Sequence, residues 1–315
     1  MCCHPPFLLF PNLYKIKQVH ILLALLVTQA LALTFRPSDS GIVGPRYAQM
    51  LEQWEQWRKE SGGWLEIAEY GESPQHRPLR LLILRKPGDF STRTALLMTG
   101  NMHGGEYLQV EDRLPLELMN RRSKEGVFRR FFDRGGAIVA VPVVNPDGYD
   151  SRSRGNSLGK DLNRDWPLPY HKIAGFHEVE TSALARALDA LTGSPTRFDF
   201  RVTVDYHCCL GAVLYPWSNG QVLPPPELAR HHALAQLASN LLNVEIGTTG
   251  QLLGYSPLGT AKDCYYEHFG ATSFTFEGRE RVEKNYLSQH LAWWETLVDA
   301  VMKEKKEPLL AKKAE

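Results

Sequence analysis

Residues 95–106 read ALLMTGNMHGGE and predict a strand, a glycine-rich turn and the start of a helix. The first residues form a nearly continuous apolar run, which is typical of a strand covered on both faces. Gly104 and Gly105 permit a tight turn. The residues that follow, 106–122, have a helical pattern. This stretch therefore predicts one strand–helix unit of an α/β protein.

The same alternation continues along the chain. Further strands are predicted at 79–84, 137–142, 200–206, 212–216 and 272–277. Further helices are predicted at 45–60, 178–191, 226–242, 262–268 and 286–304. Alternating strands and helices favour an α/β fold with a mixed, mostly parallel twisted sheet and helices on both faces.

Composition excludes several classes of protein. The chain has 315 residues, 43% of them hydrophobic and 23% charged, which is typical of a globular protein. Its net charge of +1 gives no electrostatic reason to expect a nucleic-acid partner. Because no apolar stretch reaches about 18 residues, we expect no stable membrane anchor. Five cysteines are too few for a disulfide scaffold at this length.

The N-terminal residues resemble a secretory signal peptide. Lys15 and Lys17 precede an apolar run at 21–27, and a small-x-small site ends at Ala32. The alternative is a buried first helix. We expect a signal peptide at 1–32, one domain at 33–305 and a charged tail at 306–315. The mature protein is then exported, either periplasmic or secreted, and we expect a monomer.

His103 and Glu106 are candidate zinc ligands. A turn can direct both side chains at one point, and Zn²⁺ accepts an imidazole nitrogen and a carboxylate oxygen. Alone, this pair is a weak signal, since a glutamate at a helix start is ordinary. His207 is the best third ligand, because strand alternation puts Thr203, Asp205 and His207 on one face. It falls at the carboxyl end of its strand, where α/β sheets bind ligands.

Glu277 is the candidate general base. Strand alternation places Ser273, Thr275 and Glu277 opposite Phe274 and Phe276. A carboxylate at the end of an apolar strand is costly to bury unless it is paired, near a metal or functional. Near zinc it could take a proton from water that the metal makes acidic.

Six motifs occur together in one order. They are His103-x-x-Glu106, NPDGY at 145–149, RGNSLGKDLNR at 154–164, His207, Tyr255 followed by GTAKD at 259–263, and FTFE at 274–277. Each is modest alone, but the ordered set resembles the zinc carboxypeptidase family, the carboxypeptidase A-like enzymes. The resemblance runs from about residue 45 to 300.

The resemblance implies a role for each matching position. It implies one Zn²⁺ held by His103, Glu106 and His207, with Asp161 orienting His103. It implies that Glu277 is the general base and that Arg154 stabilises the oxyanion. The substrate is then a peptide with a free C-terminal carboxylate, and the residues implied to bind it are Asn163, Arg164 and Tyr255.

Two departures bear on the substrate. Gly105 stands where pancreatic relatives have an arginine, so one cationic contact is missing. Lys262 matches the base of the specificity pocket and predicts a preference for an acidic C-terminal residue. The alternative is that Lys262 points outward from a helix start.

Three functions remain open. The first is a zinc carboxypeptidase that releases an acidic C-terminal residue. The second is a murein peptide amidase or carboxypeptidase cutting at the D-glutamyl–diaminopimelate bond of cell-wall peptides. The third is a zinc-bearing peptide-binding protein without turnover. Because adjacent cysteines rarely bridge, buried thiols are favoured over extra metal ligands for Cys208 and Cys209, and the state of Cys208, Cys209 and Cys264 is left open.

Overall fold

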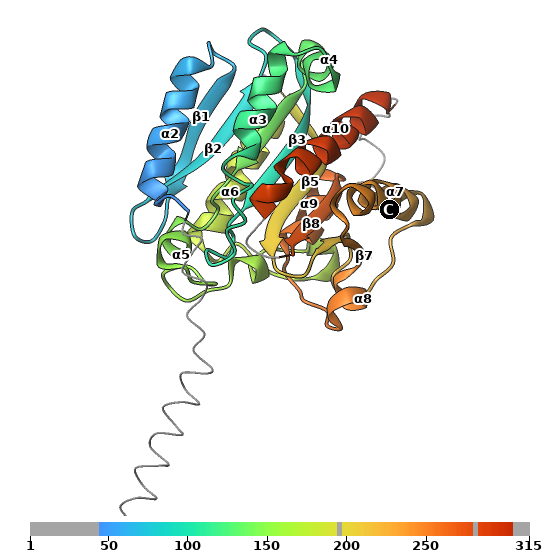
Figure 1. Cartoon of the computed structure of the whole chain (residues 1–315). Coiled ribbons are helices and arrows are strands. Elements are labelled where there is room, and N and C mark those ends of the chain that lie inside the picture. Colours follow the sequence, from blue (N-terminus) through green and yellow to red (C-terminus); the bar gives the residue numbers. More distant parts are fainter. Residues whose placement is uncertain (1–43, 194–196, 280–282, 305–315) are drawn as a thin grey trace, which may run out of the picture. The chain divides into compact units, whose positions relative to one another are not determined.

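The structure, a computed structural model, describes residues 44–193, 197–279 and 283–304 (Figure 1). The predicted signal peptide at 1–32 and the tail at 306–315 lie outside these residues and stay predictions. Among the described residues, no helix is both long and apolar enough to cross a membrane.

One eight-stranded sheet forms the centre of the fold, with strand order β1-β2-β4-β3-β5-β8-β6-β7. Its four central strands β4, β3, β5 and β8 are parallel, whereas β1, β2 and β4 pair antiparallel, as do β6 and β8. The mixed sheet of the prediction is thus confirmed. The bounds are β1 Leu65–Glu72, β2 Pro78–Arg85, β3 Thr92–Gly100, β4 Ala137–Val141, β5 Arg197–Cys208, β6 Ala212–Leu214, β7 Glu245–Gly247 and β8 Thr272–Gly278.

Helices cover both faces of the sheet. Trp293 of α10 packs against Phe274 and Phe276 of β8, and Figure 1 shows α10 lying over the sheet. On the opposite side of β8, the Ser273 hydroxyl donates to the Lys262 carbonyl of α9. The bounds are α2 Tyr47–Glu60, α3 Leu114–Asn120, α4 Val127–Asp133, α5 Pro146–Ser151, α6 Val179–Thr192, α7 Pro225–Leu242, α8 Thr249–Leu253, α9 Ala261–Phe269 and α10 Leu287–Lys303.

The predicted helix at 106–122 is wrong over most of its length. Only α3 and the start of the short 3-10 helix Arg121–Ser123 are helical, and residues 101–113 form turns, bends and irregular structure. Pro115 stands in the first turn of α3, where its missing N–H costs nothing, whereas inside a longer helix it would remove a hydrogen bond. The backbone N–H groups of Leu108 and Val110 instead donate to the side chain of Glu111.

Glu111 should make stability depend on pH. Burial raises its pKa to about 8, although the N–H groups of Leu108 and Val110 act to lower it. In the unfolded chain the Glu111 carboxyl ionises near pH 4.5. The loss of stability caused by ionising it in the folded protein is therefore absent below pH 4.5 and complete above pH 8. Calorimetry should show the Tm of both proteins at pH 5 and at pH 8.5. Between these pH values we expect the Tm of the wild type to fall further than the Tm of Glu111→Gln, by on the order of 5 °C. Parallel Tm curves for the two proteins would contradict this.

Candidate active site

The candidate site lies where β3, β5 and β8 end. These parallel strands are neighbours, and His207 and Glu277 are register partners on β5 and β8. His103 and Glu106 follow β3 in a tight turn closed by the Glu106 N–H donating to the His103 carbonyl, 2.9 Å away. A Cβ at Gly104 would overlap the backbone of Gly148, so only glycine fits there.

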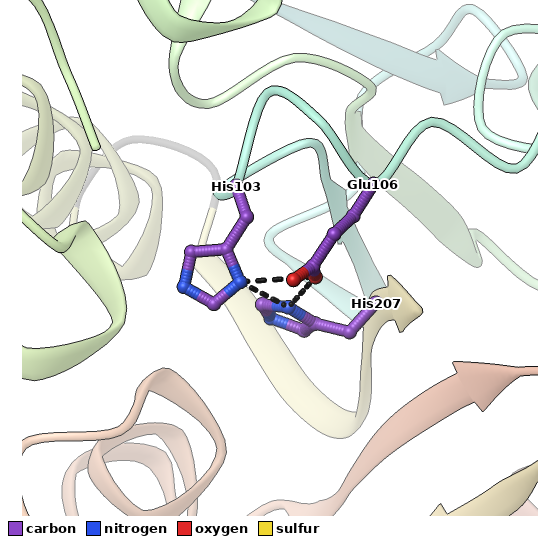
Figure 2. A group of neighbouring side chains, drawn as sticks. All are labelled: His103, Glu106 and His207. Carbon is purple, nitrogen blue, oxygen red and sulfur yellow. Dashed lines mark hydrogen bonds and ion pairs between the residues drawn. The ribbon is translucent and has the colours of Figure 1, made fainter. Parts of the chain in front are cut away.

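Three side chains from these segments meet at one point. The Nδ1 atoms of His103 and His207 are 3.1 Å apart, and Glu106 Oε2 lies 2.9 Å from each (Figure 2). Ligands of a tetrahedral zinc ion are about 3.3 Å apart, so this set, which could hold a metal ion, has the donor types and spacing that zinc requires.

A carboxylate fixes each histidine from its far side. His103 Nε2 is 2.8 Å from Asp161 Oδ1, and His207 Nε2 is 2.7 Å from Asp205 Oδ2. Each Nε2 therefore donates its proton outward and leaves Nδ1 free to bind a metal. Asp205 was not assigned a role from sequence, although alternation had put it on the face of His207.

Glu106 is an anion in this arrangement. Burial acts to raise its pKa, but the imidazoles of His103 and His207, whose Nδ1 atoms both face the carboxylate, hold the pKa well below the usual range. An ionised carboxylate is the form that binds a metal.

Replacing Asp205 should weaken metal binding. Asp205 Oδ1 accepts from the Thr99 hydroxyl while Oδ2 faces His207, so Asp205→Asn can present an N–H to Nε2 and favour the wrong tautomer. We expect zinc to bind about 10- to 100-fold more weakly, as measured by competition with a chromogenic chelator. Asp199→Asn, on the same strand beside Arg201, is the matched control; equal zinc affinity in both variants would contradict this role.

Glu277 lines the same cavity as the three candidate ligands. Burial raises its pKa, the charges of His207 and His103 lower it, and that of Glu106 raises it. Since register partners on adjacent strands point to one face, its carboxylate is beside His207. A raised pKa suits a group that accepts a proton and then returns it.

Arg154 and the pair Asn163–Arg164 border the cavity. The Arg154 guanidinium contacts Asp161 Oδ2 at 3.0 Å and Glu106 Oε1 at 3.2 Å, and its side chain is 52% exposed. The Asn163 amide oxygen accepts from the Ala261 N–H, and the Arg164 guanidinium donates to the Asn163 carbonyl. Among the described residues, Arg164 has no carboxylate within ion-pair distance.

A model of the zinc carboxypeptidase family matches residues 50–291. The chain belongs to this family. It is 27% identical to carboxypeptidase SOL1 of Arabidopsis thaliana over 228 residues, which are 66% of this chain and 44% of that protein. The chain therefore spans less than half the length of this relative.

Solved structures share the fold. One is thrombin activatable fibrinolysis inhibitor, with a TM-score of 0.70 and 18% identity over 85% of this chain and 79% of that one. Another is carboxypeptidase A from Helicoverpa armigera, with a TM-score of 0.65 and 18% identity over 84% and 75% of the two chains.

In this member of the zinc carboxypeptidase family, Lys262 is buried and lines the cavity, so the outward-pointing alternative is wrong. Its Nζ donates to the Tyr215 carbonyl, the Ser218 hydroxyl and Asp263 Oδ1, at 3.2, 2.9 and 2.9 Å. All three N–H groups are therefore used, and Asp263 offsets the charge that sequence had assigned to the pocket. Tyr255 lines the mouth of the cavity and is 49% exposed.

Ser218 and Asp263 are site residues that sequence reasoning missed. The Ser218 hydroxyl contacts Lys262 and Thr260, and its N–H donates to Asp263. Asp263 stood next to Lys262 in the GTAKD motif, which was the available signal. Nothing in the sequence around Ser218 pointed to the site, because it arrives from a loop 44 residues before Lys262.

The expectation for the adjacent cysteines is wrong. Cys208 and Cys209 are joined by a disulfide and line the cavity, whereas Cys264 is a free, buried thiol. The two cysteines directly follow His207, and the disulfide between these adjacent residues forms part of the cavity wall.

Proposed function

We propose that this chain is a zinc-dependent carboxypeptidase that binds one zinc ion and hydrolyses the C-terminal peptide bond of peptides. One observation carries the proposal: a cavity of about 190 Å³ is lined by the metal-binding set, by Glu277 and by the cationic groups Arg154 and Arg164. A metal-dependent catalyst for C-terminal hydrolysis brings together a metal site, a general base and a cationic group that binds the terminal carboxylate.

His103, Glu106 and His207 would hold the zinc ion. When bound, zinc supplies Lewis acidity, which makes water more acidic and polarises a carbonyl. The Glu277 carboxylate accepts a proton from the attacking water and returns it to the leaving amine. The Arg154 guanidinium, beside Glu106, stabilises negative charge on the oxygen of the scissile carbonyl. The exposed fork of Arg164 binds the terminal carboxylate through two hydrogen bonds.

Matched peptides with free and amidated C-termini test this function. The free peptide should lose its last residue, because the clamp requires a carboxylate, and the amide should be cleaved at least about 100-fold more slowly. Mass spectrometry of the products measures both, and a chelator provides the blank. Equal cleavage of the amide, or peptide binding without any product, would contradict the proposal; the second outcome would favour the non-catalytic alternative.

The proposed side-chain preference is acidic and modest. Lys262 at the cavity wall supports attraction of a carboxylate, while Asp263 at 2.9 Å reduces it. We expect kcat/KM for a C-terminal Glu peptide to exceed that for the isosteric Gln peptide by about 3- to 10-fold. The ratio should fall to about 1 in Lys262→Gln/Asp263→Asn, which removes both charges together and so leaves neither one buried and unpaired.

A ratio near 1 in the wild type would contradict the acidic preference while leaving the carboxypeptidase function intact. A preference for peptides ending in diaminopimelate over the peptides ending in Glu and in Gln would instead support the cell-wall alternative.

Export is part of the proposal. The positive flank, apolar run and small-x-small site at 15–32 support it. N-terminal sequencing of the mature protein should begin at Leu33; a mature chain that retains Lys15 would contradict cleavage.

A further inference from the structure

A second cavity, separate from the substrate cavity, lies between α6, α9 and the segment 166–176. We call it the α6–α9 cavity. Its volume is about 390 Å³, within the range of about 300–1,000 Å³ typical of small-molecule sites. None of its lining residues lines the substrate cavity. Its walls come from residues 166–176, from 185–189 of α6 and from 264–269 of α9.

The inner wall is aromatic and held in place. Trp166 packs edge-on against Tyr265 and Phe176, with ring centroids 5.0 and 5.7 Å apart, and Tyr265 stacks on Phe269. Leu188 of α6 closes the opposite side and is fully buried. Water in such a space has few hydrogen-bond partners, so an aromatic ring that displaces it gains free energy.

The charged part of the lining is acidic. Asp189 and Glu267 line the cavity, and no lysine or arginine does so among the described residues. Each carboxylate has a histidine beside it: His268 Nε2 is 2.6 Å from Asp189 Oδ1, and His171 Nδ1 is 3.7 Å from Glu267 Oε2. Burial, together with the charges of Glu267, Asp263 and Asp189, raises the pKa of the Cys264 thiol to about 12.

Two elements that line the α6–α9 cavity, Trp166 and α9, are hydrogen-bonded to segments of the substrate site. The Trp166 N–H donates to the Gly259 carbonyl, and the Ala261 N–H at the start of α9 donates to the Asn163 side chain. The next residue of α9, Lys262, lines the substrate cavity. A molecule bound in the α6–α9 cavity therefore contacts Trp166 and α9, the elements that position Asn163 and Lys262.

We propose that the α6–α9 cavity is an effector site for a small aromatic amine. The ring lies among Trp166, Phe176 and Leu188, and the ammonium group lies at Asp189 and Glu267. The ligand chemistry follows from an apolar interior with an acidic rim. The effector role, unlike binding itself, rests on the proposed carboxypeptidase function.

Calorimetric titration with 3-phenylpropylamine tests binding. The amine should bind the wild-type holoenzyme saturably at one site, at least about fivefold more tightly than the uncharged 3-phenylpropan-1-ol. Ala185→Phe fills the cavity and should weaken amine binding at least tenfold, whereas Ala190→Phe, exposed on the same helix outside the cavity, should not.

The double variant Asp189→Asn/Glu267→Gln tests the charge. In this variant the amine and the alcohol should bind equally, and Glu52→Gln on α2 is the charge control. Undiminished binding to Ala185→Phe, or equal wild-type affinities for amine and alcohol, would overturn the site.

Photolabelling of the wild type needs no variant to fold. 4-Azidophenethylamine should attach within 166–176, 185–189 or 264–269, and labels confined to the substrate cavity would overturn the proposal.

Peptidase kinetics test the effector role. Saturating 3-phenylpropylamine should change kcat/KM at least twofold in the wild type and should leave the kcat/KM of Ala185→Phe unchanged. Binding without any change in kcat/KM would refute only the effector role. If the protein had no peptidase activity, calorimetry would still detect binding of the amine.

Discussion

Glu277→Gln should lower kcat/KM for peptide hydrolysis by about 10³- to 10⁴-fold, because the amide cannot accept the proton of the attacking water. The substitution keeps the size of the side chain, and Glu277 is not among the three groups that meet around the candidate metal position. Zinc affinity and Tm should therefore change little. Initial rates on a C-terminal Glu peptide, with zinc content measured on the same sample, check both expectations.

Glu245→Gln is the matched control for this experiment. Glu245 is an exposed glutamate on β7 of the same sheet, and its replacement should leave turnover within about twofold of wild type. If Glu277→Gln retained wild-type turnover, the assignment of the general base would be wrong.

His207→Ala should abolish activity by removing the metal. Two ligands remain, and Asp205, which is fully buried, loses the imidazole it contacts at 2.7 Å. We expect zinc affinity to fall at least about 100-fold and the protein to be destabilised by about 3–5 kcal/mol, the cost of leaving a buried charge unpaired. Chelator competition and denaturant unfolding measure the two effects.

His232→Ala, an exposed histidine on α7, is the control for His207→Ala and should change neither quantity. Full zinc binding by His207→Ala would show that the metal is held elsewhere.

The sequence predicted the elements whose burial is strongest. The buried strands β2, β3, β4, β5 and β8 are apolar runs, and the long amphipathic helices α2, α6, α7 and α10 carry a helical period. β1 was missed because, at the edge of the sheet, it is only partly buried and carries polar residues throughout. α4, α5, β7 and α8 are short, so packing against the rest of the chain, rather than local preference, decides them.

The candidate site was predictable for a different reason. His103, Glu106, His207 and Glu277 are weak signals singly, and it was their order together with Arg154, Asp161, Asn163 and Arg164 that identified the family. Parallel pairing of β3, β5 and β8 then brings the ligand and base positions to one edge. Contacts across the fold were not predictable. The Lys262 contacts with Tyr215 and Ser218 join positions 47 and 44 residues apart and have no local sequence signature.

Anomalous diffraction at the zinc edge, on crystals grown without chelator, locates the metal. We expect one strong peak per chain, bonded to the Nδ1 atoms of His103 and His207 and to the Glu106 carboxylate at about 2.0–2.2 Å. Zinc found only at other residues, with these three side chains turned away from one another, would contradict this expectation.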